Sequence, residues 1–153
     1  MIATPDELAE IRRHAETEYP SECCGVILTR GRDGRRLLHC RNVQDALHAS
    51  DPVTHPRDSR TAYNIDPKNL LQIGRQEADG YVVSVIYHSH CDAGAYFSEM
   101  DKRNALFGGE PAYPDATYVV ASVVSGRVAA AEAFRWNGAR RDFLAVEFKE
   151  FQA

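Results

Sequence analysis

Length, composition and charge already limit what this protein can be. The chain has 153 residues, of which 44% are hydrophobic and 26% are charged, and its formal net charge is −4 at pH 7. We expect a single domain over residues 1–153, because domains commonly hold about 100–150 residues. No run of about 18 apolar residues is present, which argues against a membrane span. The acidic balance argues against nucleic-acid binding, which favours a basic surface.

The cysteines and the N-terminus indicate a compartment. Cys23, Cys24, Cys40 and Cys91 form no Cys-x-x-Cys pair, and adjacent cysteines such as the first two are poor candidates for a disulfide. The N-terminus is acidic and lacks the basic and then apolar segments of a signal peptide. We therefore expect a reduced, cytoplasmic protein.

The first half of the chain predicts a helix and a hairpin. Residues 4–7, Thr-Pro-Asp-Glu, combine an N-cap, a proline at N1 and a capping-box glutamate, and Tyr19-Pro20 ends the helix. Residues 23–29 form a short apolar run typical of a buried strand, and residues 35–42 predict its hairpin partner. Residues 43–61 are polar and contain two prolines, so a long and functional or mobile loop is expected.

The second half predicts a further alternation of strands and helices. A short strand at 63–65 precedes a helix that starts at Asp66-Pro67. A buried strand at 81–87 precedes a helix over 98–107, and residues 108–115 form a loop. Strands are then expected at 117–125, 128–136 and 143–148, separated by glycine-containing turns. This order predicts an α/β (α+β) fold in which helices pack on a mixed sheet.

One segment carries side chains that could bind a metal. His88 and His90 follow an apolar strand, and residues i and i+2 of a strand share one face, so both imidazoles can converge on one point. Asp101 takes position N3 of the next helix if Ser98 is its N-cap. Two histidines and one carboxylate leave a fourth tetrahedral position open, which is typical of a catalytic zinc.

Two more residues could complete a hydrolytic site. A catalytic zinc lowers the pKa of its water from about 15.7 to about 7, and a base must then move the proton to the leaving amine. Glu22 is the candidate base, because it precedes the buried strand 23–29 and could lie at a sheet edge near the metal. Ser98 could donate a hydrogen bond to the oxyanion that forms on the attacked carbonyl.

The pattern Glu22 … His88-x-His90-x7-Ser98-x-x-Asp101 resembles the JAMM (JAB or MPN) metalloprotease family. Residues 19–25, 63–67 and 113–115 also resemble flanking segments of that family. The resemblance implies a cytidine-deaminase-like fold with a partly barrel-like mixed sheet. It also implies one Zn²⁺ per chain, bound by His88, His90 and Asp101. In the same comparison Glu22 is the general base and Ser98 stabilises the oxyanion.

The resemblance also implies a substrate class. The family cuts peptide or isopeptide bonds after the Gly-Gly tail of ubiquitin-like proteins, and the small bacterial members process sulfur-carrier proteins by releasing cysteine or another C-terminal addition. The tail could bind as an added strand beside residues 81–87. Many relatives pair, so a homodimer is compatible with the resemblance.

Some features leave alternatives open. Cys91 replaces a proline that is frequent in the family, and strand alternation predicts that its side chain points away from the metal face. Arg57, Asp58 and Arg60 in the long loop could hold a carboxylate or a carrier protein, or could simply be solvated. The main alternative function is a non-catalytic MPN-type scaffold that binds a ubiquitin-like partner. A zinc deaminase would need His-x-Glu and Pro-Cys-x-x-Cys motifs, and an iron oxygenase would order its ligands differently.

Overall fold

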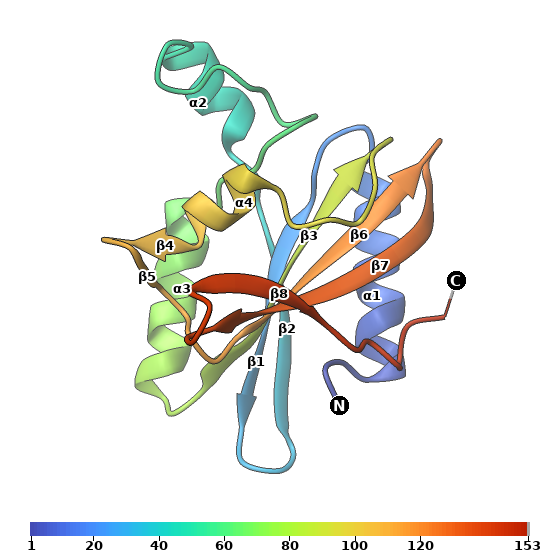
Figure 1. The fold of residues 1–153 in the computed structure, drawn as a ribbon, viewed down its shortest axis with the longest axis vertical. Coiled ribbons are helices and arrows are strands. Elements are labelled where there is room, and N and C mark those ends of the chain that lie inside the picture. Colours follow the sequence, from blue (N-terminus) through green and yellow to red (C-terminus); the bar gives the residue numbers. More distant parts are fainter. Residues whose placement is uncertain (153) are drawn as a thin grey trace.

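The computed structural model describes residues 1–152, which form helices around a central sheet (Figure 1). The helices are α1 (Pro5–Glu18), α2 (Gln44–Ser50), α3 (Pro67–Ala78) and α4 (Glu99–Asn104). The strands are β1 (Cys24–Arg30), β2 (Gly34–Cys40), β3 (Val82–Cys91), β4 (Leu106–Phe107), β5 (Glu110–Pro111), β6 (Thr117–Val124), β7 (Arg127–Asn137) and β8 (Asp142–Val146).

The main sheet has the strand order β2-β1-β3-β6-β7-β8. It is mixed, because β3 and β6 are parallel whereas the other neighbouring pairs are antiparallel. Strands β2 and β8 are its edges, so the sheet is open and does not close into a barrel. The predicted α+β fold with a mixed sheet flanked by helices is confirmed.

The position of β3 corrects one expectation. Strand β3 pairs with β1 on one side and with β6 on the other, and both neighbours are present at residues 85–88. Its backbone groups are therefore already paired along most of its length. The sequence had suggested that a substrate tail adds as a strand beside residues 81–87. It cannot do so at residues 85–87, where β3 has a neighbour on each side.

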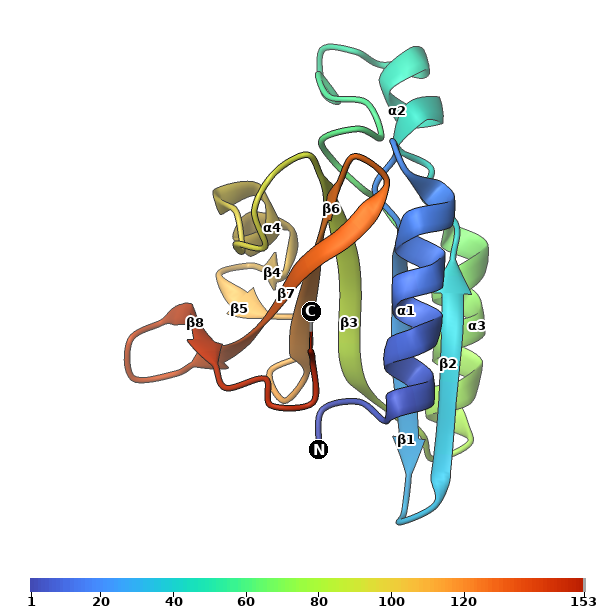
Figure 2. The ribbon, with the colours of Figure 1, turned by 90° about the vertical axis from the view of Figure 1, so that its right-hand side faces the viewer.

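Each face of the sheet carries its own core. On one face α1 contributes Ile11 and Ala15, which pack with Ile27 and Val85. On the other face Ile73 of α3 lies in the cluster that also holds alternate residues of β1 and β3. Figure 2 shows α1 lying along one side of β1 and β2. Burial on both faces explains why β1 and β3 read as nearly continuous apolar runs.

The expected long loops contain short elements. Residues 43–61 were expected to form a loop, but they include helix α2 and the segment that returns from it. Residues 63–65 do not form a strand, and Ile65 makes only an isolated bridge with Asn42. The expected helix 98–107 ends at Asn104, and a small β4–β5 ladder follows it. Among residues 1–152 no helix has the length and apolar content needed to cross a membrane.

Glycine at one position lets β1 and β3 come together below the site. A Cβ built on Gly25 would lie 2.3 Å from ring atoms of Tyr87, which is far below contact distance. Gly25 and Tyr87 are cross-strand partners in the β1–β3 ladder. The absent side chain at Gly25 therefore makes room for the aromatic residue that precedes His88.

Candidate metal centre

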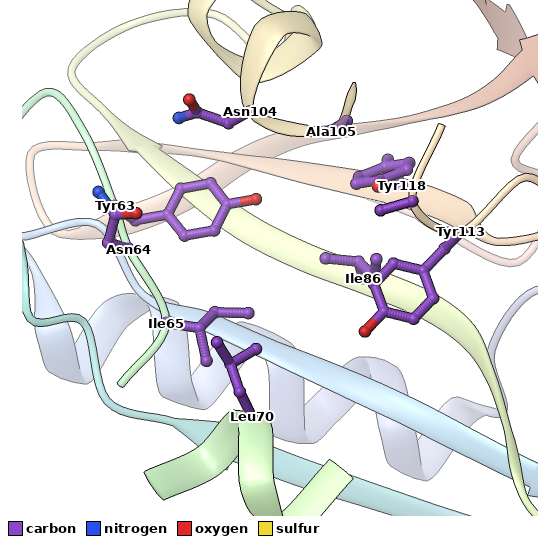
Figure 3. A pocket seen from close by; sticks show the side chains of 10 residues that line it. Tyr63, Asn64, Ile65, Leu70, Ile86, Asn104, Ala105, Tyr113 and Tyr118 are labelled. Carbon is purple, nitrogen blue, oxygen red and sulfur yellow. The ribbon is translucent and has the colours of Figure 1, made fainter. Parts of the chain in front are cut away.

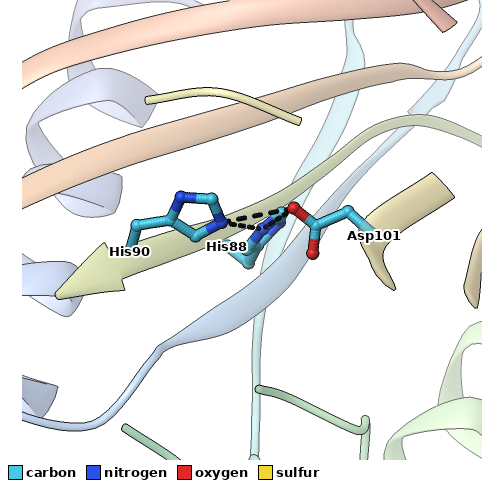
Figure 4. A group of neighbouring side chains, drawn as sticks. All are labelled: His88, His90 and Asp101. Carbon is cyan, nitrogen blue, oxygen red and sulfur yellow. Dashed lines mark hydrogen bonds and ion pairs between the residues drawn. The ribbon is translucent and has the colours of Figure 1, made fainter. Parts of the chain in front are cut away.

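His88, His90 and Asp101 meet at the end of β3 (Figure 4). The Nε2 atoms of His88 and His90 each lie 3.2 Å from Oδ2 of Asp101, and the two Nε2 atoms are 3.3 Å apart. All three side chains are buried, with exposed fractions of 0%, 6% and 7%. Strand β3 supplies both histidines from one face, and helix α4 supplies the carboxylate that faces them.

Hydrogen bonding fixes the state of one histidine. Nδ1 of His90 lies 2.8 Å from the carbonyl oxygen of Gly94, and a carbonyl can only accept, so Nδ1 carries the proton. In the neutral ring, Nε2 is then the nitrogen with the lone pair, and it is the atom that faces Asp101 Oδ2 and the other imidazole. This is the arrangement by which a backbone carbonyl orients a metal-binding histidine.

Packing holds the second histidine. The ring of His88 stacks on Tyr63 with a centroid separation of 4.6 Å. Its Nδ1 atom is buried without a hydrogen-bond partner in the described chain, so its Nε2 atom makes the polar contacts of this ring. Three ligand atoms within 4.8 Å of one another, two from imidazoles and one from a carboxylate, fit a zinc-like divalent cation.

Helix α4 positions the carboxylate through a capping box. Asp101 N donates to Ser98 Oγ at 3.0 Å, and Ser98 N donates to Asp101 Oδ2 at 2.9 Å. Asp101 is thus at position N3 of the helix that Ser98 caps, as the Ser98-x-x-Asp101 spacing predicts. The same carboxylate caps the helix and faces the histidines.

The site favours an ionised carboxylate. Burial alone would raise the pKa of Asp101, but hydrogen bonds to His88 and His90 outweigh it and hold that pKa far below its ordinary value. Burial lowers the pKa of His88, despite its bond to Asp101. For His90 the contacts with Asp101 and Gly94 outweigh burial and raise the pKa. The lowered pKa of His88 favours the neutral imidazole that a metal ligand needs, and Asp101 is ionised as a ligand must be, whereas His90 must release its extra proton when a metal binds.

Glu22 lies in the wall of the same cavity. This cavity of about 110 Å³ is also lined by His90, Ser98 and Asp101. Glu22 is only 5% exposed, and burial raises the pKa of its carboxyl to about 8, although His90 and Arg57 act in the opposite direction. Its backbone N donates to Ser59 O at 2.7 Å, which joins it to the segment that follows α2. A carboxyl group with a pKa near neutrality is suited to proton transfer.

Two of the candidates in the loop 43–61 reach the cavity, and so does Tyr96, which no sequence signal had marked. Arg57 and Arg60 line it from the segment after α2, and Tyr96 packs edge-on against His90 with a centroid separation of 4.9 Å. Cys91 also lines this cavity, but it is not part of the cluster of His88, His90 and Asp101. Burial raises the pKa of the Cys91 thiol to about 12, so the thiol stays protonated in the metal-free protein.

A second, more apolar cavity lies behind Tyr63 (Figure 3). Its volume is about 200 Å³, and its walls include Tyr63, Ile86, Tyr113 and Tyr118. Tyr63 thus lines this cavity and also stacks on the ring of His88. Neither the second cavity nor the stacking of Tyr63 was expected, because the sequence suggested only a short strand there.

Comparison with known families decides how this geometry is to be interpreted. Residues 4–137 match the family described as prokaryotic homologs of the JAB domain. The chain belongs to this family. The JAB-domain match includes every residue of the buried cluster and also Glu22 and Ser98.

Individual relatives of this JAB-domain protein differ in coverage. The CysO-cysteine peptidase of Mycobacterium tuberculosis is 34% identical over 123 residues, which is 80% of this chain and 73% of that protein. Tail tip assembly protein K of Escherichia phage N15 is 35% identical over 92 residues, or 60% of this chain. That match spans only 31% of the phage protein, so the chain corresponds to less than a third of it.

Solved structures agree with the fold. The solution structure of protein DSY2949 from Desulfitobacterium hafniense aligns over 94% of this chain and 88% of its own, with a TM-score of 0.65 at 21% identity. A solution structure of a Salinibacter ruber protein covers 94% of this chain and 87% of its own, with a TM-score of 0.60 at 27% identity.

Proposed function

We propose that this JAB-domain protein is a zinc-dependent peptidase or isopeptidase. It hydrolyses the bond after the C-terminal Gly-Gly of a ubiquitin-like sulfur-carrier protein and releases cysteine or another amino acid. The observation that carries the proposal is the cluster of His88, His90 and Asp101. Two of its members, His90 and Asp101, line one cavity with Glu22. The relationship to CysO-cysteine peptidases supports the choice of substrate.

The chain supplies groups for each part of the reaction. A Zn²⁺ ion held by His88, His90 and Asp101 would act as a Lewis acid that acidifies water and polarises the scissile carbonyl. Glu22 takes a proton from the attacking water and gives it to the leaving amine. Ser98 donates a hydrogen bond from its hydroxyl to the oxyanion, since its Oγ already accepts from Asp101 N and its own proton is free for a second partner.

The burial of Glu22 suits this double role. In the metal-free protein burial raises the pKa of this carboxyl to about 8, so it holds a transferred proton more firmly than an exposed glutamate and can still pass it on to an amine. A bound Zn²⁺ would favour the ionised carboxylate, which is the form that takes the proton from water. The adjoining Ser59 carbonyl fixes the backbone of Glu22, so the carboxyl position is set by the fold rather than by a flexible loop.

The test is cleavage of CysO carrying a C-terminal cysteine, followed by mass spectrometry. Zinc-loaded wild type should remove one cysteine residue, whereas Glu22→Gln should bind zinc and lose at least about 1,000-fold in kcat, because the proton carrier is gone. Glu99→Gln is the matched control, since it removes the same charge from a side chain that is 85% exposed beside the site.

Two results would contradict the proposal. One is unchanged cleavage by Glu22→Gln, which would remove the base from the mechanism. The other is stoichiometric zinc without cleavage of CysO-cysteine or of an isopeptide-linked carrier, which would favour a scaffold that binds a ubiquitin-like partner.

A further inference from the structure

Two arginines lie in the wall of the catalytic cavity without a role in the mechanism above. Arg57 and Arg60 line the cavity together with Glu22, His90 and Ser98. Within residues 1–152 no carboxylate oxygen lies within 4.0 Å of either guanidinium, whereas Arg35 and Arg141 pair with glutamates. Both side chains are exposed, so they are accessible to an anion that enters the cavity.

The backbone that carries these arginines is firmly held. Ser59, between them, is buried, and its carbonyl accepts from Glu22 N at 2.7 Å. Ser59 N donates to Asp45 Oδ1 at 2.7 Å, and the Arg57 carbonyl accepts from Gln44 Nε2 at 2.8 Å. Helix α2, which supplies Gln44 and Asp45, therefore fixes the arginine segment relative to Glu22.

The two arginines are not equivalent. Hydrogen bonds from Ser59, and beyond them the charge of Arg60, lower the pKa of Asp45, so Arg60 already has a carboxylate nearby. The charge of Arg57 instead acts on Glu22, where it opposes the effect of burial. Of the two arginines, Arg57 is thus the one whose charge acts on the group that protonates the leaving amine.

We propose that Arg57, with Arg60 beside it, binds the free α-carboxylate of the amino acid that is released. This rests on the proposed function, in which water adds across the Gly–X amide and Glu22 gives the proton to the amine of X. In a C-terminal amino acid, a single Cα separates that amine from its carboxylate, so the carboxylate must lie next to Glu22. A guanidinium matches a carboxylate with two parallel hydrogen bonds.

The proposal narrows the substrate class. A lysine side-chain isopeptide presents its leaving amine at the end of a long methylene chain, with no carboxylate near it. A cavity of about 110 Å³ holds on the order of a few water molecules, which suits one small residue. The site therefore selects a single residue at the C-terminus over an isopeptide-linked protein.

The experiment compares two carriers that differ in one group, CysO-cysteine with a free carboxylate and CysO-cysteinamide. Binding to zinc-loaded Glu22→Gln is measured by calorimetry, so that no turnover interferes. The acid should bind at least about 10-fold more tightly than the amide, and adding Arg57→Ala should reduce that ratio to about twofold or less. Arg57→Lys should restore part of it, whereas Arg140→Ala, an exposed arginine in the β7–β8 turn, should leave it unchanged.

Equal binding of acid and amide by Glu22→Gln would overturn the proposal, and so would an equal weakening of both by Arg57→Ala. Wild-type turnover reports separately on the peptidase activity. Equal cleavage of CysO-cysteine and CysO-cysteinamide would agree with the proposed peptidase activity and would refute the proposed carboxylate site. Acid-selective binding without any cleavage refutes the peptidase and supports the carboxylate site.

Discussion

Glu22 combines two properties that oppose each other, burial and a capacity to ionise. Its ordinary pKa of 4.5 rises to about 8 because burial disfavours the charged carboxylate. In the folded protein the carboxyl therefore holds its proton at pH values where the unfolded chain has released it. Below about pH 4.5 the burial of Glu22 does not change the free energy of unfolding through its ionisation. Above that pH the free energy of unfolding is reduced, and the reduction grows as the pH rises toward 8.

Removal of this carboxyl should consequently stabilise the metal-free protein. Glu22→Gln keeps the shape and cannot ionise, so we expect its free energy of unfolding to exceed that of wild type by roughly 1–3 kcal/mol at pH 8 and to match it near pH 4.5. Urea denaturation at the two pH values measures this difference. Identical stability at pH 8 would show that Glu22 is not buried as a carboxyl group.

Asp101 should control metal affinity more than any neighbouring acid. Asp101→Asn removes the only carboxylate in the cluster, and we expect zinc affinity to fall by more than about 100-fold, measured by competition with a chromophoric chelator. Glu99→Gln in the same helix turn should change it little. Comparable affinities for Asp101→Asn and wild type would mean that zinc binds elsewhere.

At the scale of elements, the short helix α4 depends on its first turn. Ser98→Ala deletes the capping acceptor for Asp101 N, so stability should fall by about 1 kcal/mol. It also deletes the hydroxyl that we propose as the oxyanion donor, so kcat should fall by about 10²–10³. Ser98→Asn restores a capping side chain without the hydroxyl. Recovery of both stability and kcat in Ser98→Asn would contradict the oxyanion role, because the cap alone would then explain the effect.

Strands β1 and β3 also depend on one close approach. Gly25→Ala would place a Cβ 2.3 Å from the Tyr87 ring, so the strands must separate next to His88, and we expect a loss of more than about 2 kcal/mol. Gly74→Ala in α3 meets nothing within 4 Å and should gain about 0.5–1 kcal/mol. Thermal unfolding of both variants checks the contrast, and equal melting temperatures would exclude the predicted clash.

The elements that the sequence predicted are those with local signals. Helices α1 and α4 begin at capping boxes, which are visible as four-residue patterns. The N-cap of helix α2 is Val43, which makes no side-chain cap, and the helix buries only Gln44, so it has neither a start signal nor an apolar stripe. The features of the candidate site likewise fall into those with a local sequence signal and those without one. The spacing of His88, His90 and Asp101 is local, whereas the stacking of Tyr63 on His88 depends on the tertiary fold.

At the scale of the whole molecule, strand order was the property that sequence could not supply. Periodicity and turns marked most strands, but nothing in a strand states which strands flank it, and the central place of β3 excluded the expected addition of a substrate tail. Tertiary packing also decides which loop residues reach the cavity. Arg57 and Arg60 reach it because Ser59 is anchored to Glu22, a contact between distant parts of the chain.

One ion pair connects α1 to the far edge of the sheet. Glu7 accepts from Arg35 Nε and Nη2 at 2.8 and 2.9 Å. Burial works to raise its pKa, but Arg35 and Thr4 outweigh burial and lower it. The stabilisation is therefore complete above about pH 4.5 and is lost as the pH falls below it. Glu7→Gln should cost about 1–2 kcal/mol at pH 7 and progressively less in acid, by urea denaturation. A cost independent of pH would exclude the ion pair.

The capping box at the start of α4 should affect how long a metal ion stays bound rather than which atoms bind it. Asp101 Oδ2 accepts from Ser98 N and faces both imidazoles, and the helix that holds it has only six residues. Short helices open at their ends more easily than a core strand does. Each opening of this turn would move the carboxylate away from β3, so the lifetime of a bound ion would depend on how often this one helical turn opens. A stronger cap would slow the exchange of the ion without altering a single ligand.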